Sequence, residues 1–305
     1  MDTSSKKIII AALAGNAAVA LTKFVAAAMT GSSAMLSEGI HSVVDTGNQG
    51  LLLFGLRRAK KPADEKFPFG YGKEIYFWSF IVAIMIFAVG AGVSIYEGIN
   101  HILHPTATEN PMVNYIVLIL AMIFEGIAWY FAFTQFSRAK GKWGYIEAVQ
   151  KGKDPSIFVV LFEDSAAMLG LVVAFIGILM GQITGNPVYD GAASIIIGLI
   201  LGGTAAWLAY ETKSLLIGES ATSDLIREVR KIASSSDKVE HVNEVLTMHM
   251  GPDFVLVNVS VDFADNHTVG VIETTIAEMD SKIKEAYPII KRVFIEAEAK
   301  AVSST

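Results

Sequence analysis

The sequence predicts an all-α membrane domain of six transmembrane helices, followed by a small α+β domain. Apolar residues make up 52% of the 305 residues and charged residues only 18%, which is unlike an ordinary soluble domain or a disordered chain. The apolar residues gather into runs of roughly 20, the length with which a helix crosses a bilayer's hydrocarbon core. Beyond residue 211 these runs give way to shorter amphipathic and alternating segments.

Six apolar segments are long enough to span a membrane. Their expected bounds are 8–29, 34–56, 76–100, 112–136, 157–180 and 188–210. The first run continues to full spanning length without a signal-type cleavage site, so we interpret it as the first transmembrane helix. We expect a transmembrane domain over residues 1–212 and a cytoplasmic domain over residues 213–305.

The distribution of basic residues predicts the orientation. Lys and Arg occur before the first span, between the second and third, between the fourth and fifth, and after the sixth, whereas the three opposite loops carry none. Because short cytoplasmic loops are enriched in Lys and Arg, we expect both termini in the cytoplasm. The pattern fits a bacterial inner membrane, and an organelle membrane remains an alternative.

The C-terminal part predicts an αββαβ order. Residues 225–233 form an amphipathic stretch after possible N-cap residues. Valines at every second position from 255 to 261 indicate a strand over 254–263, paired across a turn with 239–250. A helix over 269–286 and a strand over 291–297 complete the order.

Charge and cysteine content exclude several kinds of partner and site. Residues 1–215 hold equal numbers of basic and acidic residues, so the net charge of -6 lies in the C-terminal part. Without a clustered basic surface, nucleic acid is not expected as a partner. The chain has no cysteine, which excludes disulfides, thiolate metal sites and thiol nucleophiles.

The second span carries a polar stripe. Ionisable side chains inside a span are costly and are functional-site candidates by default. Glu38, His41 and Asp45 lie within about 60° of one another on a helix. The stripe must face other helices or a water-filled path rather than lipid. Its members are Glu38, His41, Asp45, Asn48 and Gln49.

The spacing within this stripe suits a metal ion. His41 and Asp45 are four residues apart, so both side chains can approach one ion. An imidazole nitrogen together with a carboxylate suits zinc and its first-row neighbours. Glu125 on the fourth span and the adjacent Glu163 and Asp164 on the fifth are further candidates. Because adjacent residues diverge by about 100° on a helix, we favour Asp164 as the ligand.

Each candidate also has a structural interpretation. The pair in the second span would then join helices by a hydrogen bond, although acids on other spans favour the metal site. For Glu125, helix packing or proton relay is as good an interpretation as metal contact. For Glu38 we expect a position beside the ligands or at the entrance, as for Asn48. His101 and His104, beyond the third span, fit interfacial capping better than metal capture.

Several features together resemble the cation diffusion facilitator family. They are the stretch HSVVD at 41–45, FGYGKEIYFWSF at 69–80, an acid-bearing fifth span and the terminal αββαβ order. The resemblance covers residues 8–299. It implies a homodimeric transporter, not an enzyme, that moves zinc or a related divalent cation (manganese, cobalt, iron) across the bilayer in exchange for protons. It implies no prosthetic group.

The resemblance also implies a ligand set between the second and fifth helices. His41 and Asp45 match the second-helix pair, and Asp164 matches the second ligand on the fifth helix. Val160 stands where the family has His or Asp, so three of four expected ligands remain. The alternatives for the fourth ligand are Glu163, Gln49 and water.

Other family sites match less well. Asp64 matches an acid often used before the third span, near the entrance, but Tyr71 replaces a family His. In the C-terminal domain, Asn243 and Val259 replace His ligands of some members. A zinc cluster between two tails is therefore not expected. The possible remnants of such a site are Glu296 and Glu298.

Two other functions are alternatives to transport. The apolar Val160 favours a non-transporting membrane protein that acts as a binding or scaffold partner through its acidic tail. An intramembrane enzyme is the weakest alternative, because the sequence contains no H-E-x-x-H, G-x-S-x-G or P-loop motif.

Overall fold

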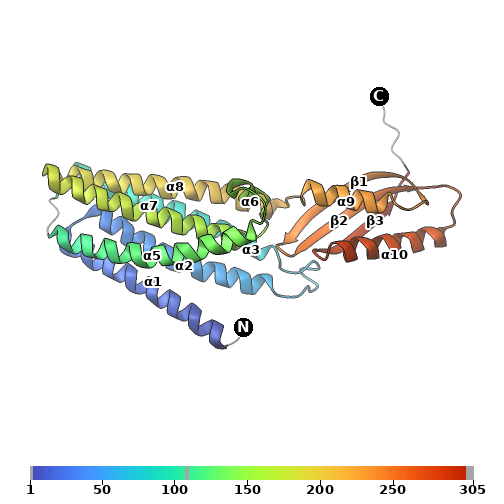
Figure 1. Ribbon diagram of the computed structural model, residues 1–305, viewed down its shortest axis with the longest axis horizontal. Helices are drawn as coiled ribbons and strands as arrows, with labels where there is room; N and C mark the ends of the chain where they lie inside the picture. Colours follow the sequence, from blue (N-terminus) through green and yellow to red (C-terminus); the bar gives the residue numbers. More distant parts are fainter. Residues whose placement is uncertain (1–2, 107–109, 300–305) are drawn as a thin grey trace, which may run out of the picture. The chain divides into compact units, whose positions relative to one another are not determined.

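The computed structural model describes residues 3–106 and 110–299, with side chains from residue 16 onward. The chain divides into two compact units (Figure 1). The first contains the residues up to Arg57 together with Ile75–Lys213. The second contains Arg58–Glu74 together with the residues from Ser214 onward. The connection at 58–74, which we expected to be a loop of the membrane domain, thus packs with the C-terminal residues.

The first unit is a bundle of long helices. The chain runs through α3 (Glu74–Met85), the π-helical segment η1 (Ile86–Ala91) and α4 (Gly92–Leu103) without a break. A short helix, α6 (Tyr145–Lys151), precedes α7. The other helices are α1 (Thr3–Thr30), α2 (Ser33–Ala59), α5 (Pro111–Ala139), α7 (Pro155–Thr184) and α8 (Val188–Ile217).

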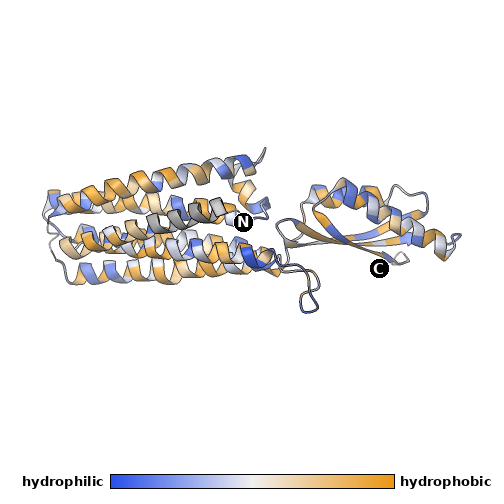
Figure 2. Ribbon diagram, turned by 90° about the horizontal axis from the view of Figure 1, so that it is seen from below, coloured by the Kyte–Doolittle hydropathy of each residue, from blue (hydrophilic) through white to orange (hydrophobic). Residues whose placement is uncertain are grey.

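In the described ranges, four helices are long and apolar enough to cross a membrane: Glu74–Leu103, Pro111–Ala139, Pro155–Thr184 and Val188–Ile217. Long apolar helices thus lie where the last four spans were predicted. In α1, the stretch Asn16–Thr30 is a shorter apolar helix. Helix α2 has the required length, but the charged and polar residues along it lower its hydropathy. Figure 2 shows the helices of the first unit coloured mostly as hydrophobic residues. The first two spans therefore remain predictions.

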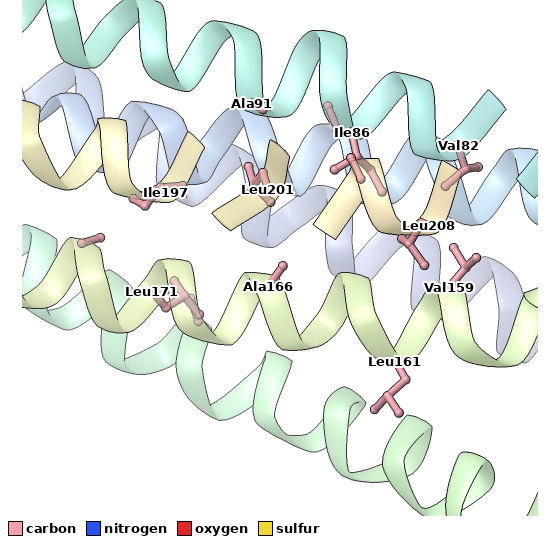
Figure 3. Packing of buried hydrophobic residues seen from close by; sticks show 14 of the residues in the cluster. Val82, Ile86, Ala91, Val159, Leu161, Ala166, Leu171, Ile197, Leu201 and Leu208 are labelled. Atoms are coloured by element: carbon pink, nitrogen blue, oxygen red, sulfur yellow. The ribbon is translucent and has the colours of Figure 1, made fainter. Parts of the chain in front are cut away.

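Apolar residues of the long helices form the core of the first unit, and Figure 3 shows the part of it contributed by α3, η1, α7 and α8. Ile86 of η1, Leu171 of α7 and Leu201 of α8 are almost completely buried there. Glycine allows α4 and α8 to approach closely, since a Cβ on Gly98 would lie 2.6 Å from the carbonyl oxygen of Gly191. Helix α5, by contrast, exposes large apolar side chains along much of its length, as a lipid-facing helix does.

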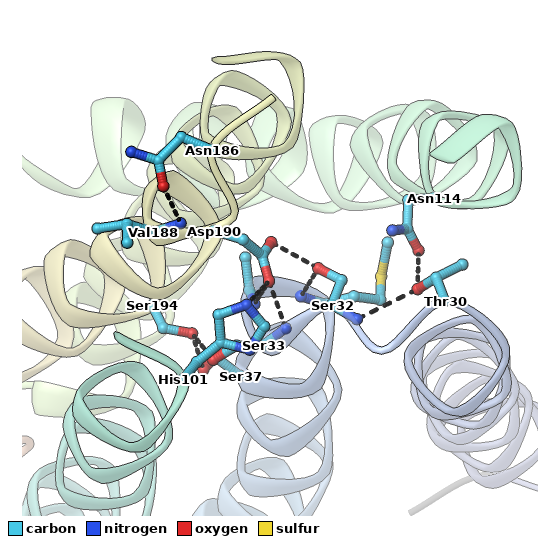
Figure 4. A network of polar contacts seen from close by, with 12 residues as sticks. Thr30, Ser32, Ser33, Ser37, His101, Asn114, Asn186, Val188, Asp190 and Ser194 are labelled. Atoms are coloured by element: carbon cyan, nitrogen blue, oxygen red, sulfur yellow. Dashed lines mark hydrogen bonds and ion pairs between the residues drawn. The ribbon is translucent and has the colours of Figure 1, made fainter. Parts of the chain in front are cut away.

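A polar network surrounds the start of α2 (Figure 4). Asp190 of α8 accepts hydrogen bonds from the Ser32 hydroxyl at 2.7 Å and from the Ser33 backbone N–H at 2.5 Å. Ser194, one turn further along α8, contacts the Ser33 hydroxyl at 2.8 Å. His101 of α4 lies beside Asp190, with Nε2 at 3.8 Å from its carboxylate. The Asp190 carboxylate thus satisfies backbone donors that the first turn of α2 leaves free.

The second unit has the predicted α+β composition. Its elements are α9 (Ser223–Ala233), β1 (Val239–Gly251), β2 (Phe254–Phe263), α10 (Val269–Ala286) and β3 (Ile290–Ala297). The sheet order is β1-β2-β3, with β1 antiparallel and β3 parallel to β2. The alternating valines of β2 are buried among apolar residues of α9 and α10, because alternate residues of a strand share one face. The connection at 58–74 packs against this unit, where the ring centroid of Phe69 lies 6.5 Å from that of Phe294 on β3.

Candidate metal site

His41 and Asp45 lie one turn apart on α2, as their spacing predicts. His41 is completely buried, and its Nδ1 is 3.3 Å from Oδ1 of Asp45. Within the described residues, neither ring nitrogen of His41 has a hydrogen-bond partner, and Asp45 Oδ1 has none either. Buried polar atoms normally find a partner. These atoms therefore offer lone pairs that a cation can use.

Asp45 and Asp164 line the same cavity of about 50 Å³. Asp45 comes from α2 and Asp164 from α7, while α1 and α5 supply the remaining walls. Space on this scale is enough for a water molecule or an ion. The lining residues are Asn16, Val19, Ser42, Asp45, Gln49, Phe124, Glu125, Ala128, Asp164 and Ala167.

The adjacent acids of α7 have different surroundings. Glu163 is buried and accepts a hydrogen bond of 2.6 Å from the side-chain amide of Asn48 on α2. It also interacts with the carboxyl group of Asp45. Asp164 lines the cavity instead. Val160, one turn earlier, packs against the apolar core of the first unit.

The expected ligands do not form a closed cluster. Across residues 3–106 and 110–299, the structure has no group of three or more His, Asp or Glu side chains placed to hold a metal ion. Several acids instead have partners within the bundle, as the Asn48–Glu163 hydrogen bond shows. A metal ion bound by His41, Asp45 and Asp164 would therefore require these side chains to move closer together.

Sequence reasoning missed one ionisable residue of this region, Lys23 of α1. Its side chain is completely buried. The ammonium group lies 3.1 Å from Oε2 of Glu38, 2.7 Å from Oε1 of Glu125 and 2.8 Å from the Ser42 hydroxyl. A lysine in the middle of the first apolar run was the available signal, because a charge within a span is a site candidate by default.

The other candidates have distinct positions. Gln49 accepts a hydrogen bond of 3.0 Å from Asn16, which links α2 to α1. Asp64 lies exposed in the second unit, where it accepts hydrogen bonds from the Tyr71 hydroxyl at 2.6 Å and the Phe67 backbone at 2.8 Å. Both hydrogen bonds lower the pKa of Asp64, and the one from Tyr71 has the larger effect.

The tail residues that replace family ligands have structural contacts. Val259 belongs to the apolar core of the second unit. Asn243 donates to the Ser260 hydroxyl at 3.1 Å, and that hydroxyl donates to Glu298 at 2.7 Å. Glu296 accepts a longer hydrogen bond of 3.4 Å from Asn258.

The family assignment follows from a sequence comparison. The model of the cation efflux transmembrane domain matches residues 9–217. The chain belongs to the cation efflux family. This is a family of multi-pass integral membrane proteins that transport cations and are not enzymes.

Similar members of the cation efflux family differ in the metal that their names give. The chain is 36% identical over 260 residues to the proton-coupled zinc antiporter SLC30A9, mitochondrial, of Xenopus laevis, covering 84% of this chain and 46% of that protein. It is 29% identical to metal tolerance protein C4 of Arabidopsis thaliana, over 86% of this chain and 58% of the relative. It is 24% identical to the manganese efflux system protein MneP of Bacillus subtilis, over 95% of both chains. The chain thus spans about half the length of the first relative.

Proposed function

We propose that this protein exports a divalent transition-metal cation in exchange for protons, and that zinc is the favoured metal. One observation carries the proposal: Asp45 of α2 and Asp164 of α7 line one cavity beside the buried His41, whose ring nitrogens have no hydrogen-bond partner among the described residues. An imidazole with two carboxylates is a donor set for zinc, and it is also compatible with manganese, cobalt and iron(II). The relatives' names include both zinc and manganese.

Proton exchange has a direct chemical basis in this donor set. Imidazole nitrogen and carboxylate oxygen bind either a metal ion or a proton with the same lone pairs. Binding of the cation to His41, Asp45 and Asp164 displaces protons, and protonation from the other side of the membrane releases the cation. Alternation between two openings then converts a proton gradient into metal export.

The setting of this activity is part of the proposal. Basic residues at the start of α1, between α2 and α3, between α5 and α7 and near the end of α8 favour cytoplasmic termini and a bacterial inner membrane. The small α+β unit would then lie in the cytoplasm, and the working form would be a homodimer. Glu163, which the Asn48 hydrogen bond holds on the α2 side, would support the ligands from outside the cavity, and Gln49 would be the nearer candidate for a fourth ligand.

Transport by purified protein tests the proposal. Proteoliposomes containing a pH-sensitive dye are supplied with zinc, manganese, cobalt or iron(II), and metal uptake and proton movement are recorded together. We expect metal flux with opposing proton movement in the wild type and its loss in Asp45→Ala and Asp164→Ala. Persistent flux in both variants would refute the site. Metal binding without flux of any metal would favour the non-transporting alternative.

A further inference from the structure

The proposed transport function leaves Lys23 without a role. This lysine of α1 is completely buried and bonds to groups on two other helices, Glu38 and Ser42 on α2 and Glu125 on α5. Removing a charge from water costs several kcal/mol unless a partner compensates it. A charge in such a position needs an explanation beyond helix packing, which apolar residues provide at lower cost.

Lys23 divides the acids around the cavity into two groups. Three carboxyl groups line the cavity, those of Asp45, Glu125 and Asp164. Only Glu125 is paired with the ammonium group, through Oε1 at 2.7 Å, while its Oε2 has no hydrogen-bond partner in the part of the chain that the structure describes. The carboxylate of Glu125, a potential oxygen ligand, is thus held by the Lys23 ammonium group.

The two carboxylates on Lys23 are not equivalent. Glu38 is completely buried, and its Oε1 occupies space that exists because residue 170 of α7 is glycine, where a Cβ would overlap this oxygen. Glu125 lines the cavity and keeps 19% of its side-chain surface accessible. Packing therefore fixes Glu38 in place, whereas the bond to Lys23 is what restrains Glu125.

Resting on the proposed transport function, we propose that Lys23 is a positioning residue that determines metal specificity by holding Glu125 out of the ligand set. With Glu125 neutralised, a cation meets one imidazole and two carboxylates, which suits zinc. With Glu125 released, it meets one imidazole and three carboxylates, an oxygen-rich and more negative site. Harder cations such as manganese prefer that site.

The test compares zinc and manganese uptake in proteoliposomes for four variants. Lys23→Met should shift the zinc-to-manganese ratio toward manganese by about tenfold, the lower end of the effect of losing a residue that orients metal ligands. Lys23→Arg, which keeps the positive charge, should retain most of the wild-type ratio. Lys23→Met/Glu125→Gln should restore it, because the released carboxylate is then absent. Glu125→Gln alone should leave the ratio close to that of the wild type.

The outcomes test the role of Lys23 separately from the proposed transport function. An unchanged ratio in Lys23→Met, or no restoration in the double variant, would overturn it while wild-type flux upholds the proposed function. If Lys23→Met does not fold, Glu125→Gln still tests the inference. A large change in the zinc-to-manganese ratio of this variant would show that Glu125 is already a ligand in the wild type and would overturn the inference. If the wild type shows no flux, the same ratios are measured as zinc and manganese affinities in detergent.

Discussion

The side-chain amide of Asn48 on α2 donates a hydrogen bond of 2.6 Å to the carboxylate of Glu163 on α7. Both side chains are buried. The bond fixes Glu163 against α2, and the next residue, Asp164, lines the cavity with Asp45. Two acids that are adjacent in sequence thereby have different surroundings, and this difference is the basis for proposing Asp164 as the ligand.

Substitution of the two acids should separate their roles. Asp164→Asn removes an anionic ligand, so we expect zinc affinity to fall by more than about tenfold. Glu163→Gln keeps an oxygen that can accept the Asn48 hydrogen bond, so the affinity should fall much less. Equilibrium binding of zinc to each purified protein measures both effects. Equal losses in the two variants would contradict the different roles.

The carboxylate of Asp190 should stabilise the start of α2. Asp190→Ala leaves the hydroxyl of Ser32 and the backbone N–H of Ser33 without their acceptor. Loss of a buried hydrogen-bond partner costs about 1–3 kcal/mol, so we expect a lower thermal midpoint in detergent. Asp190→Asn, which keeps one acceptor oxygen, is the matched control and should fall less. An unchanged midpoint for Asp190→Ala would show that the network contributes little.

Glycine at the contact of α4 and α8 should be required for stability. In Gly98→Ala the new Cβ would lie 2.6 Å from the carbonyl oxygen of Gly191, so the helices must separate, at a cost of about 1–3 kcal/mol. Gly203→Ala on α8 is the control, because a Cβ there meets nothing within 4 Å. Its midpoint should hold or rise, since alanine favours helix more than glycine. Similar losses in both variants would refute the packing explanation.

The hydroxyl of Tyr71 should control the ionisation of Asp64. Its hydrogen bond, reinforced by the Phe67 backbone, lowers the pKa of Asp64. Tyr71→Phe removes the larger cause, so this pKa should rise toward the ordinary value of about 3.9. Stabilisation of the connection by this bond is present above the ordinary pKa and is lost as the pH falls through the lowered one. Carboxyl-carbon NMR titration of both proteins measures the shift, and an identical pKa would contradict it.

Local periodicity predicted much of the fold. The valines at every second position of β2 are buried as their spacing indicates, and the last four predicted spans correspond to long apolar helices. The contact of His41 with Asp45 follows in the same way, because both residues belong to one helix. Such features depend on one element at a time.

Contacts between elements were less accessible from the sequence. Asp190 lies 158 residues from Ser32, yet its carboxylate accepts a hydrogen bond from the Ser32 hydroxyl. Nothing in the sequence of either segment alone indicates that they meet. Lys23 pairs with Glu125 across 102 residues. Sequence reasoning passed over this lysine within the first apolar run, and the contacts of α1 with α2 and α5 identify its partners.

The proposed cation site is built jointly by α2 and α7, and zinc-binding stoichiometry measured together with proton release tests whether both helices contribute. Purified wild-type protein is titrated with zinc in weakly buffered detergent solution, alongside Asp45→Asn and Asp164→Asn. We predict that one zinc site per chain releases protons on binding and that either substitution eliminates it. Unchanged stoichiometry and proton release in both variants would contradict a site shared by α2 and α7.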